Sequence, residues 1–182
     1  AVAPCYNPPL GLASTYDKPS ATDENLKVVP QPAVGYETSA DGKALTVKLR
    51  PGVKFHDGEP FDAAAAKYSL DRHVTMKGSY RRAEIGTIES VDVVDPATVK
   101  LNLSAPFTPI LAALADRAGL MVSPKAAKAE GAHCGHHPVC ACPLRFVQRV
   151  ARDKTGSERY PTPLKQAHDH TQRARSTPAA RR

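Results

Sequence analysis

Six side chains that could bind a transition metal lie within ten residues of this 182-residue chain, in the stretch HCGHHPVCAC from His133 to Cys142. Thiolate and imidazole groups are ligands that zinc prefers. The four that could form a tight site are Cys134, His137, Cys140 and Cys142. Their spacing lacks the Cys-x2-Cys pair and the second ligand knuckle of common zinc modules. A small Cys/His metal-binding protein is therefore kept as an alternative, while we expect no metal site and no cofactor.

Two further groups of residues could suggest acid–base or nucleophilic catalysis. His56 and Asp57 are adjacent, but they lie in a predicted turn, where an aspartate beside a surface histidine is common. Ser69, Asp71 and His73 are spaced two apart on a predicted helix, and residues two apart on a helix do not face each other. The motifs of serine hydrolases, zinc proteases and phosphate-binding loops are absent. We expect no catalytic residue and no enzyme activity.

The elements that must position these side chains are strands and helices joined by short turns. Leu45, Val47 and Leu49 alternate with polar residues, which predicts a half-buried strand. Asp-Gly pairs at residues 41–42 and 57–58 are typical of tight turns, so the strand belongs to a hairpin in an antiparallel sheet.

The remaining elements follow from caps, breakers and alternation. We expect a helix over residues 62–74 with Asp62 as its N-cap, and a shorter one over 80–85. Strands are expected near 26–29, over 88–94 and over 98–103, the last two joined by a turn at 95–97. Helices are expected over 107–114, with Pro109 in the first turn, and from Ser123-Pro124 to Gly131. The predicted class is α+β, mainly antiparallel hairpins covered by helices.

The net charge of +7 lies wholly in the last fifty residues. Residues 1–132 contain 15 Lys and Arg against 15 Asp and Glu, whereas residues 133–182 contain 10 against 3. A basic tail can bind nucleic acid through its phosphates, which gives a nucleic-acid-interacting protein as a second alternative. The tail carries no recognisable nucleic-acid motif, so we expect a solvated, disordered end and no nucleic-acid partner. No apolar run is long enough for a transmembrane helix, and no signal peptide is visible at Ala1.

Several blocks of the sequence occur in an order that is typical of one protein family. They include SADGKALTVKLRPGVKFHDGEPFDAAAAKYSLDRH (residues 39–73), IESVDVVDPATVKLNLSAPFTPILAALAD (88–116) and MVSPKAA (121–127), flanked by DENLKVVPQPA (23–33) and PVCACPLRFV (138–147). In these blocks the chain resembles the extracytoplasmic solute-binding proteins, family 5, of bacterial dipeptide, oligopeptide and nickel ABC importers.

This resemblance implies a partial lobe of a type II periplasmic-binding-protein fold over residues 23–150, comprising a small subdomain and a return strand. An irregular lead-in over 1–22 and the basic, disordered tail over 151–182 flank it. We expect the chain to be a truncated fragment of the first lobe. At Cys140 and Cys142 the family prefers small glycines, so we expect the packing of the return strand to depart from that of the family there.

The resemblance also implies a function. It is that of the substrate-binding component of a peptide-type ABC importer, in the periplasm or otherwise extracytoplasmic and peripheral to the membrane. Its partners would be a peptide or similar small solute and the permease subunits. Charged contacts with the ligand are expected from the second lobe, so the ligand-binding residues stay unknown. The stretch 39–62 is interpreted as scaffold.

Overall fold

The computed structural model describes residues 20–22, 28–30, 33–76, 79, 82–130, 139, 141, 144–150, 154–159 and 173–176. In chain order the elements of this part are β1 (Ser20–Thr22), β2 (Val28–Pro30), β3 (Ala33–Thr38), β4 (Ala44–Leu49), α1 (Ala63–Thr75), α2 (Arg82–Ile85), β5 (Ile88–Asp95), β6 (Thr98–Leu103), α3 (Ile110–Ala115), the 3-10 turn η2 (Arg117–Gly119), α4 (Pro124–Glu130), β7 (Leu144–Val150), β8 (Lys154–Arg159) and β9 (Arg173–Ser176).

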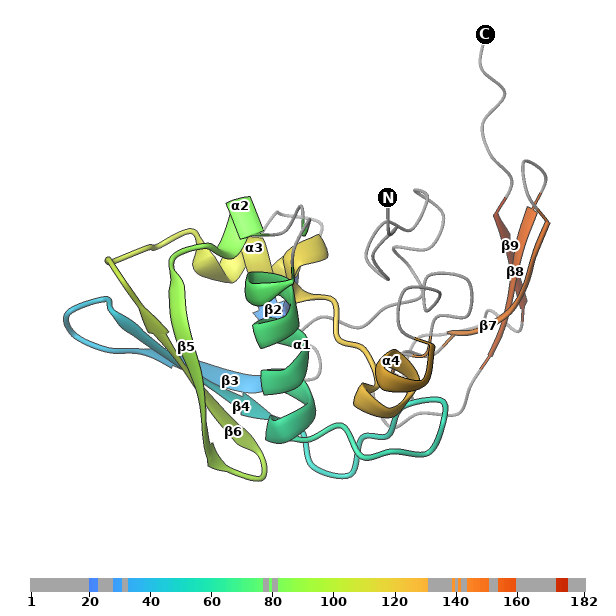
Figure 1. The fold of residues 1–182 in the computed structure, drawn as a ribbon, viewed down its shortest axis with the longest axis horizontal. Coiled ribbons are helices and arrows are strands. Elements are labelled where there is room, and N and C mark those ends of the chain that lie inside the picture. Colours follow the sequence, from blue (N-terminus) through green and yellow to red (C-terminus); the bar gives the residue numbers. More distant parts are fainter. Residues whose placement is uncertain are drawn as a thin grey trace, which may run out of the picture.

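The main body is a four-stranded antiparallel sheet in the order β3-β4-β6-β5. Figure 1 shows α1 lying across one face of this sheet, beside β5. Two smaller antiparallel sheets are formed by β1 with β2 and by β7, β8 and β9. The predicted class, α+β with antiparallel hairpins covered by helices, is confirmed.

The hairpin from β3 to β4 forms for the reasons that the sequence indicates. Gly42 has a φ of 67°, which glycine adopts without steric cost, and its N–H donates to the Ser39 carbonyl at 2.9 Å. In β4 the side chains of Leu45, Val47 and Leu49 are all buried. Strand alternation therefore places these three side chains on the covered face of the sheet.

Helix α1 begins where its cap was predicted. The Asp62 Oδ1 accepts from the Ala65 N–H at 2.9 Å, which satisfies one of the unpaired donors at the helix start. Ala66 and Leu70 are buried and Val74 packs partly buried against the core, so the predicted shared face is confirmed.

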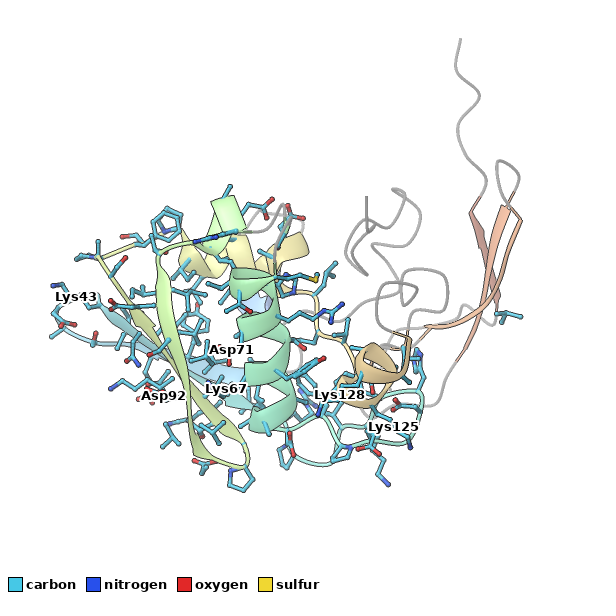
Figure 2. All side chains as sticks on the ribbon, viewed as in Figure 1. Lys43, Lys67, Asp71, Asp92, Lys125 and Lys128 are labelled. Carbon is cyan, nitrogen blue, oxygen red and sulfur yellow. The ribbon has the colours of Figure 1, made fainter. Side chains whose placement is uncertain are left out.

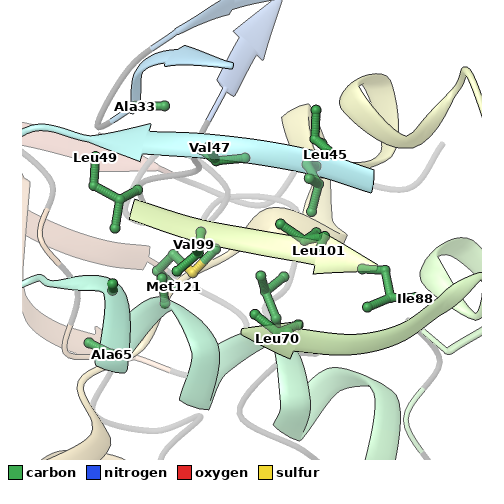
Figure 3. Close-up of a cluster of buried hydrophobic side chains, with 14 of the residues drawn as sticks. Ala33, Leu45, Val47, Leu49, Ala65, Leu70, Ile88, Val99, Leu101 and Met121 are labelled. Carbon is green, nitrogen blue, oxygen red and sulfur yellow. The ribbon is translucent and has the colours of Figure 1, made fainter. Parts of the chain in front are cut away.

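The core lies between the sheet and α1 (Figure 3). Leu45 of β4 and Leu101 of β6 are cross-strand partners, and both are 0% exposed. Leu70 of α1 lies on the helix side of this core, and Ile88 of β5 and Met121 belong to the same cluster. The central strands β4 and β6 thus each contribute three buried apolar side chains to this core.

The opposite face of the sheet is exposed and carries charged residues. Lys48 Nζ lies 2.8 Å from Glu37 Oε1 across β3 and β4. The hydrogen bond from Lys48 and its charge lower the pKa of Glu37, and the same contact raises the pKa of Lys48. Both side chains are well exposed, so this ion pair contributes little to stability.

Two predicted elements differ from the structure in detail. The alternation of Val91 and Val93 with Asp92 predicts that both valines are buried, but Val93 is 45% exposed. Its register partner is the buried Val99, so Val93 lies on the same face as Val91, and it is exposed because it is near the end of the edge strand β5. Helix α3 begins at Ile110 rather than at Phe107, with Pro109 as its N-cap. Phe107 instead belongs to a turn, since its carbonyl accepts from the Ile110 N–H at 3.2 Å.

Some strands had no signal in the sequence. β1 lies in the predicted irregular lead-in, and β8 and β9 lie in the tail that we expected to be disordered. These short segments lack apolar alternation, and they are strands because a partner strand supplies their hydrogen bonds. The boundaries of the lead-in, the lobe and the tail stay predictions. Among the described residues no helix is long and apolar enough to cross a bilayer.

We predict that Leu101→Ala lowers the free energy of unfolding by about 2–5 kcal/mol, because it removes a fully buried side chain of β6 from the core beneath α1. The matched control is Lys100→Ala, one residue away on the exposed face, which should change it by less than about 0.5 kcal/mol. Urea unfolding followed by circular dichroism measures both. Similar losses in the two variants would contradict this assignment of faces.

Candidate functional site

The loop that leads from β4 to α1 holds Asp57 at its tip. The Phe55 N–H donates to the Glu59 carbonyl at 2.8 Å, and the Phe61 N–H donates to the Val53 carbonyl at 2.9 Å. The rings of Phe55 and Phe61 pack edge to face with centroids 5.5 Å apart, and both are buried. The loop is therefore anchored in the core, which agrees with its interpretation as scaffold.

Two polar side chains of α1 point into the core. Ser69 and His73 are both 0% exposed and lie one helical turn apart. The Ser69 hydroxyl donates to the Ala65 carbonyl at 3.0 Å and accepts from the Val122 N–H at 3.1 Å. His73 Nε2 donates to the Leu120 carbonyl at 3.0 Å, since a carbonyl can only accept.

These bonds fix residues 120–123, which we call the crossing segment. It connects η2 to α4, has no regular secondary structure and is buried throughout. An irregular buried backbone needs side-chain partners for its N–H and C=O groups, and the polar face of α1 supplies them.

Ser123 ends the crossing segment and joins three parts of the chain. Its hydroxyl accepts from the Ala126 N–H at 3.2 Å and so caps α4, as predicted. The same hydroxyl donates to Asp57 Oδ2 in the loop before α1. Its backbone N–H donates to the Val139 carbonyl at 3.3 Å, so the chain returning after α4 meets the crossing segment here.

The arrangement holds backbone in place and does not bring Ser69, Asp71 and His73 together as a triad. Asp71 does not join Ser69 and His73, because it forms an ion pair with Lys67 at 2.9 Å. Figure 2 shows Lys67 and Asp71 together on the side of α1 toward β5. Asp57 accepts from the Glu59 N–H, as expected of a turn aspartate, and also from the distant Ser123 hydroxyl, which was not expected.

The metal-binding candidates Cys134, His137, Cys140 and Cys142 lie outside the described residues, so the metal-binding alternative stays a prediction. In the part of the chain that the structure describes, no three His, Cys, Asp or Glu side chains are grouped closely enough to hold an ion. Most of the basic tail is likewise outside it, and the nucleic-acid alternative also stays a prediction.

Sequence reasoning missed that Asp57, Ser69, His73 and Ser123 serve one segment. A signal was present in α1: Ser69 and His73 fall on the apolar stripe with Ala66 and Leu70, where a polar residue must find a buried partner. The partner itself is 53 residues away for Ser69, so no local pattern could identify it.

Comparison with known proteins gives consistent results. The family model described as bacterial extracellular solute-binding proteins, family 5 Middle, matches residues 27–163. The chain is 42% identical over 126 residues to the glutathione-binding protein GsiB of Pectobacterium atrosepticum, which covers 69% of this chain and 24% of that protein. It is 42% identical over 125 residues to GsiB of Salmonella typhimurium, with 68% and 24% covered. The chain thus spans about a quarter of the length of these relatives.

Solved structures show the same fold. The PBP AgaA of A. tumefaciens R10, in complex with agropinic acid, has a TM-score of 0.83 at 27% identity, covering 90% of this chain and 33% of that one. NikA of Brucella suis, in complex with Fe(III)-EDTA, has a TM-score of 0.81 at 24% identity, covering 97% and 37%. Periplasmic DppA of Helicobacter pylori, in complex with the peptide STSA, has a TM-score of 0.81 at 19% identity, covering 96% and 39%.

We predict that Ser69→Ala lowers the free energy of unfolding by about 1–3 kcal/mol, because the buried Val122 N–H loses its acceptor. Thr75→Ala is the control: this hydroxyl lies on the same helix and also bonds a carbonyl four residues back, at 2.7 Å, but it is exposed. Its change should stay below about 0.5 kcal/mol. Thermal or urea unfolding measures both, and equal effects would argue against a clamp on the crossing segment.

We also predict that Gly58→Ala lowers the free energy of unfolding by about 1–2 kcal/mol, since Gly58 has a φ of 86° and the cost is purely one of backbone conformation. An added Cβ would meet nothing within 4 Å there. Gly35→Ala is the control, because Gly35 is equally open but has no positive φ. Stability measured in parallel should fall only for the first variant.

Proposed function

This chain belongs to the bacterial extracellular solute-binding proteins of family 5, and from that membership we propose that it forms part of the substrate-binding component of a peptide-type ABC importer. The match over residues 27–163 carries the proposal, since it includes the described sheet, helices and crossing segment. The family is one of solute-binding proteins, and we propose that this chain likewise binds without catalysing a reaction.

The proposed ligand class is short peptides, with glutathione as the first to test. Relatives that are 42% identical are named glutathione-binding proteins, and a protein of the same fold has been solved with the peptide STSA. A bound peptide can pair its backbone with strand edges while fixed side chains meet its charged ends. The described residues supply the scaffold that would hold such groups in place.

The proposed setting is extracytoplasmic. A solute-binding protein of an importer closes its lobes around the ligand and presents it to the permease at the membrane surface. We therefore propose a periplasmic or otherwise extracytoplasmic location, peripheral to the membrane, with permease subunits as protein partners. NikA and DppA share this fold, and DppA is described as periplasmic.

A chimera tests the function directly. In GsiB of Pectobacterium atrosepticum, the stretch that aligns with this chain is replaced by the matching residues of this chain. We expect the chimera to bind glutathione in isothermal titration within about tenfold of GsiB itself, a difference of about 1.4 kcal/mol. This chain alone should show no saturable heat, because a ligand held between two lobes loses most of its contacts when one is missing.

Each outcome of this experiment leads to a different conclusion. A chimera that melts cooperatively but binds neither glutathione nor dipeptides would refute the proposed function. Micromolar binding by this chain alone would refute the two-lobe requirement while leaving the ligand class intact. Restored glutathione uptake in a strain that lacks GsiB would extend the result from binding to transport.

A further inference from the structure

Two residues 66 positions apart are joined at the crossing segment: Asp57, at the tip of the loop before α1, and Ser123, at the start of α4. Each also has a local role. Asp57 Oδ1 accepts from the Glu59 N–H at 3.2 Å, and Ser123 Oγ accepts from the Ala126 N–H at 3.2 Å. The bond between them uses the second carboxylate oxygen of Asp57 and the single hydroxyl proton of Ser123.

This bond is set in surroundings that strengthen it. Ser123 is 0% exposed and Asp57 is half-buried. Hydrogen bonds to a carboxylate are roughly twice as strong as neutral ones, and low local dielectric increases the difference. Because the Ser123 hydroxyl donates to Asp57 and accepts from the Ala126 N–H, its side chain is held in one orientation.

The backbone of Ser123 is held at the same time. Its carbonyl accepts from the Ala127 N–H at 2.9 Å, and its N–H donates to the Val139 carbonyl at 3.3 Å. Ala141, two residues after Val139, is 2% exposed and belongs to the core. The place where the returning chain enters the subdomain therefore depends on where Ser123 sits.

We propose that Asp57 is a positioning residue, whose carboxylate fixes Ser123 and thereby sets the start of α4 and the entry point of the returning chain at Val139. The wider meaning rests on the proposed function, because in a solute-binding protein this entry point would orient the subdomain relative to the rest of the lobe. The local effect needs no ligand, so it can be measured whether or not the proposed function holds.

The chain supplies a matched control for this bond. Lys125 Nζ lies 3.5 Å from Glu59 Oε1, so this ion pair links the same loop to the same helix. Both side chains are well exposed, and such pairs contribute little. Lys125→Ala removes a connection between the two elements without touching the buried bond.

The experiment is hydrogen–deuterium exchange on the full chain, with fragments that resolve residues 123–127, the loop at 57–59 and strand β6. In Asp57→Ala we expect exchange at Ser123, Ala126 and Ala127 to rise about tenfold, with β6 unchanged. Asp57→Asn should give exchange between that of Asp57→Ala and that of the unmodified chain, because its single amide oxygen can replace Oδ1 or Oδ2 as acceptor but not both. Lys125→Ala should behave as the unmodified chain.

The reciprocal variant tests the same bond from the other side. Ser123→Ala should raise exchange at Glu59, and Asp57→Ala combined with Ser123→Ala should add little to either alone. Unchanged exchange at 123–127 in a folded Asp57→Ala protein would overturn the proposal, as would additive effects or an equal rise in β6. Should Asp57→Ala fail to fold, the loop amides in Ser123→Ala decide: a rise confined to the loop supports the proposal, and no rise refutes it.

Discussion

One face of the strand pair β4 and β6 must be kept from water, and the arrangement of the other elements follows from this. Leu45, Val47, Val99 and Leu101 are buried on that face, and Leu45 and Leu101 are fully so. α1 covers it toward β5, and the loop carrying Phe55 contributes to the same core. Burial of this apolar area is the largest favourable term available to a chain of this kind, so each covering element has to lie close to the sheet.

Covering the sheet brings an irregular stretch of backbone into the interior, where its N–H and C=O groups need hydrogen-bond partners. The crossing segment is buried, and a buried N–H or C=O without a partner costs on the order of 1–3 kcal/mol. Ser69 and His73 of α1 supply partners, and Asp57 holds Ser123 at the segment's end. Side chains of the types found in catalytic triads are used here to fix main chain. The hydrogen bonds of these side chains therefore stabilise the fold.

The same view explains how proteins that share this scaffold carry different ligands. The stretch 39–62 provides turns at Gly42, Gly52 and Gly58 and the buried Phe55 and Phe61, all of which serve the fold. Relatives and structural neighbours over this region were described with glutathione, agropinic acid or Fe(III)-EDTA. A common framework is compatible with such variety because specificity depends on side chains mounted on the framework, while the framework depends on turns and packing.

The sequence by itself determined the elements whose signals are local. Strand β4 followed from alternation, the start of α1 from the Asp62 cap, α4 from Ser123 and Pro124, and the hairpin from Asp41-Gly42. Tertiary structure alone decided the order β3-β4-β6-β5, the exposure of Val93, the pairing of β8 with β7 and β9, and the bonds from α1 and Asp57 to the crossing segment. A cap or a turn involves atoms within a few residues of each other, so its energy depends only on neighbouring residues in the sequence. Strand order and buried hydrogen bonds join atoms tens of residues apart, and their energy exists only once the chain has closed those distances.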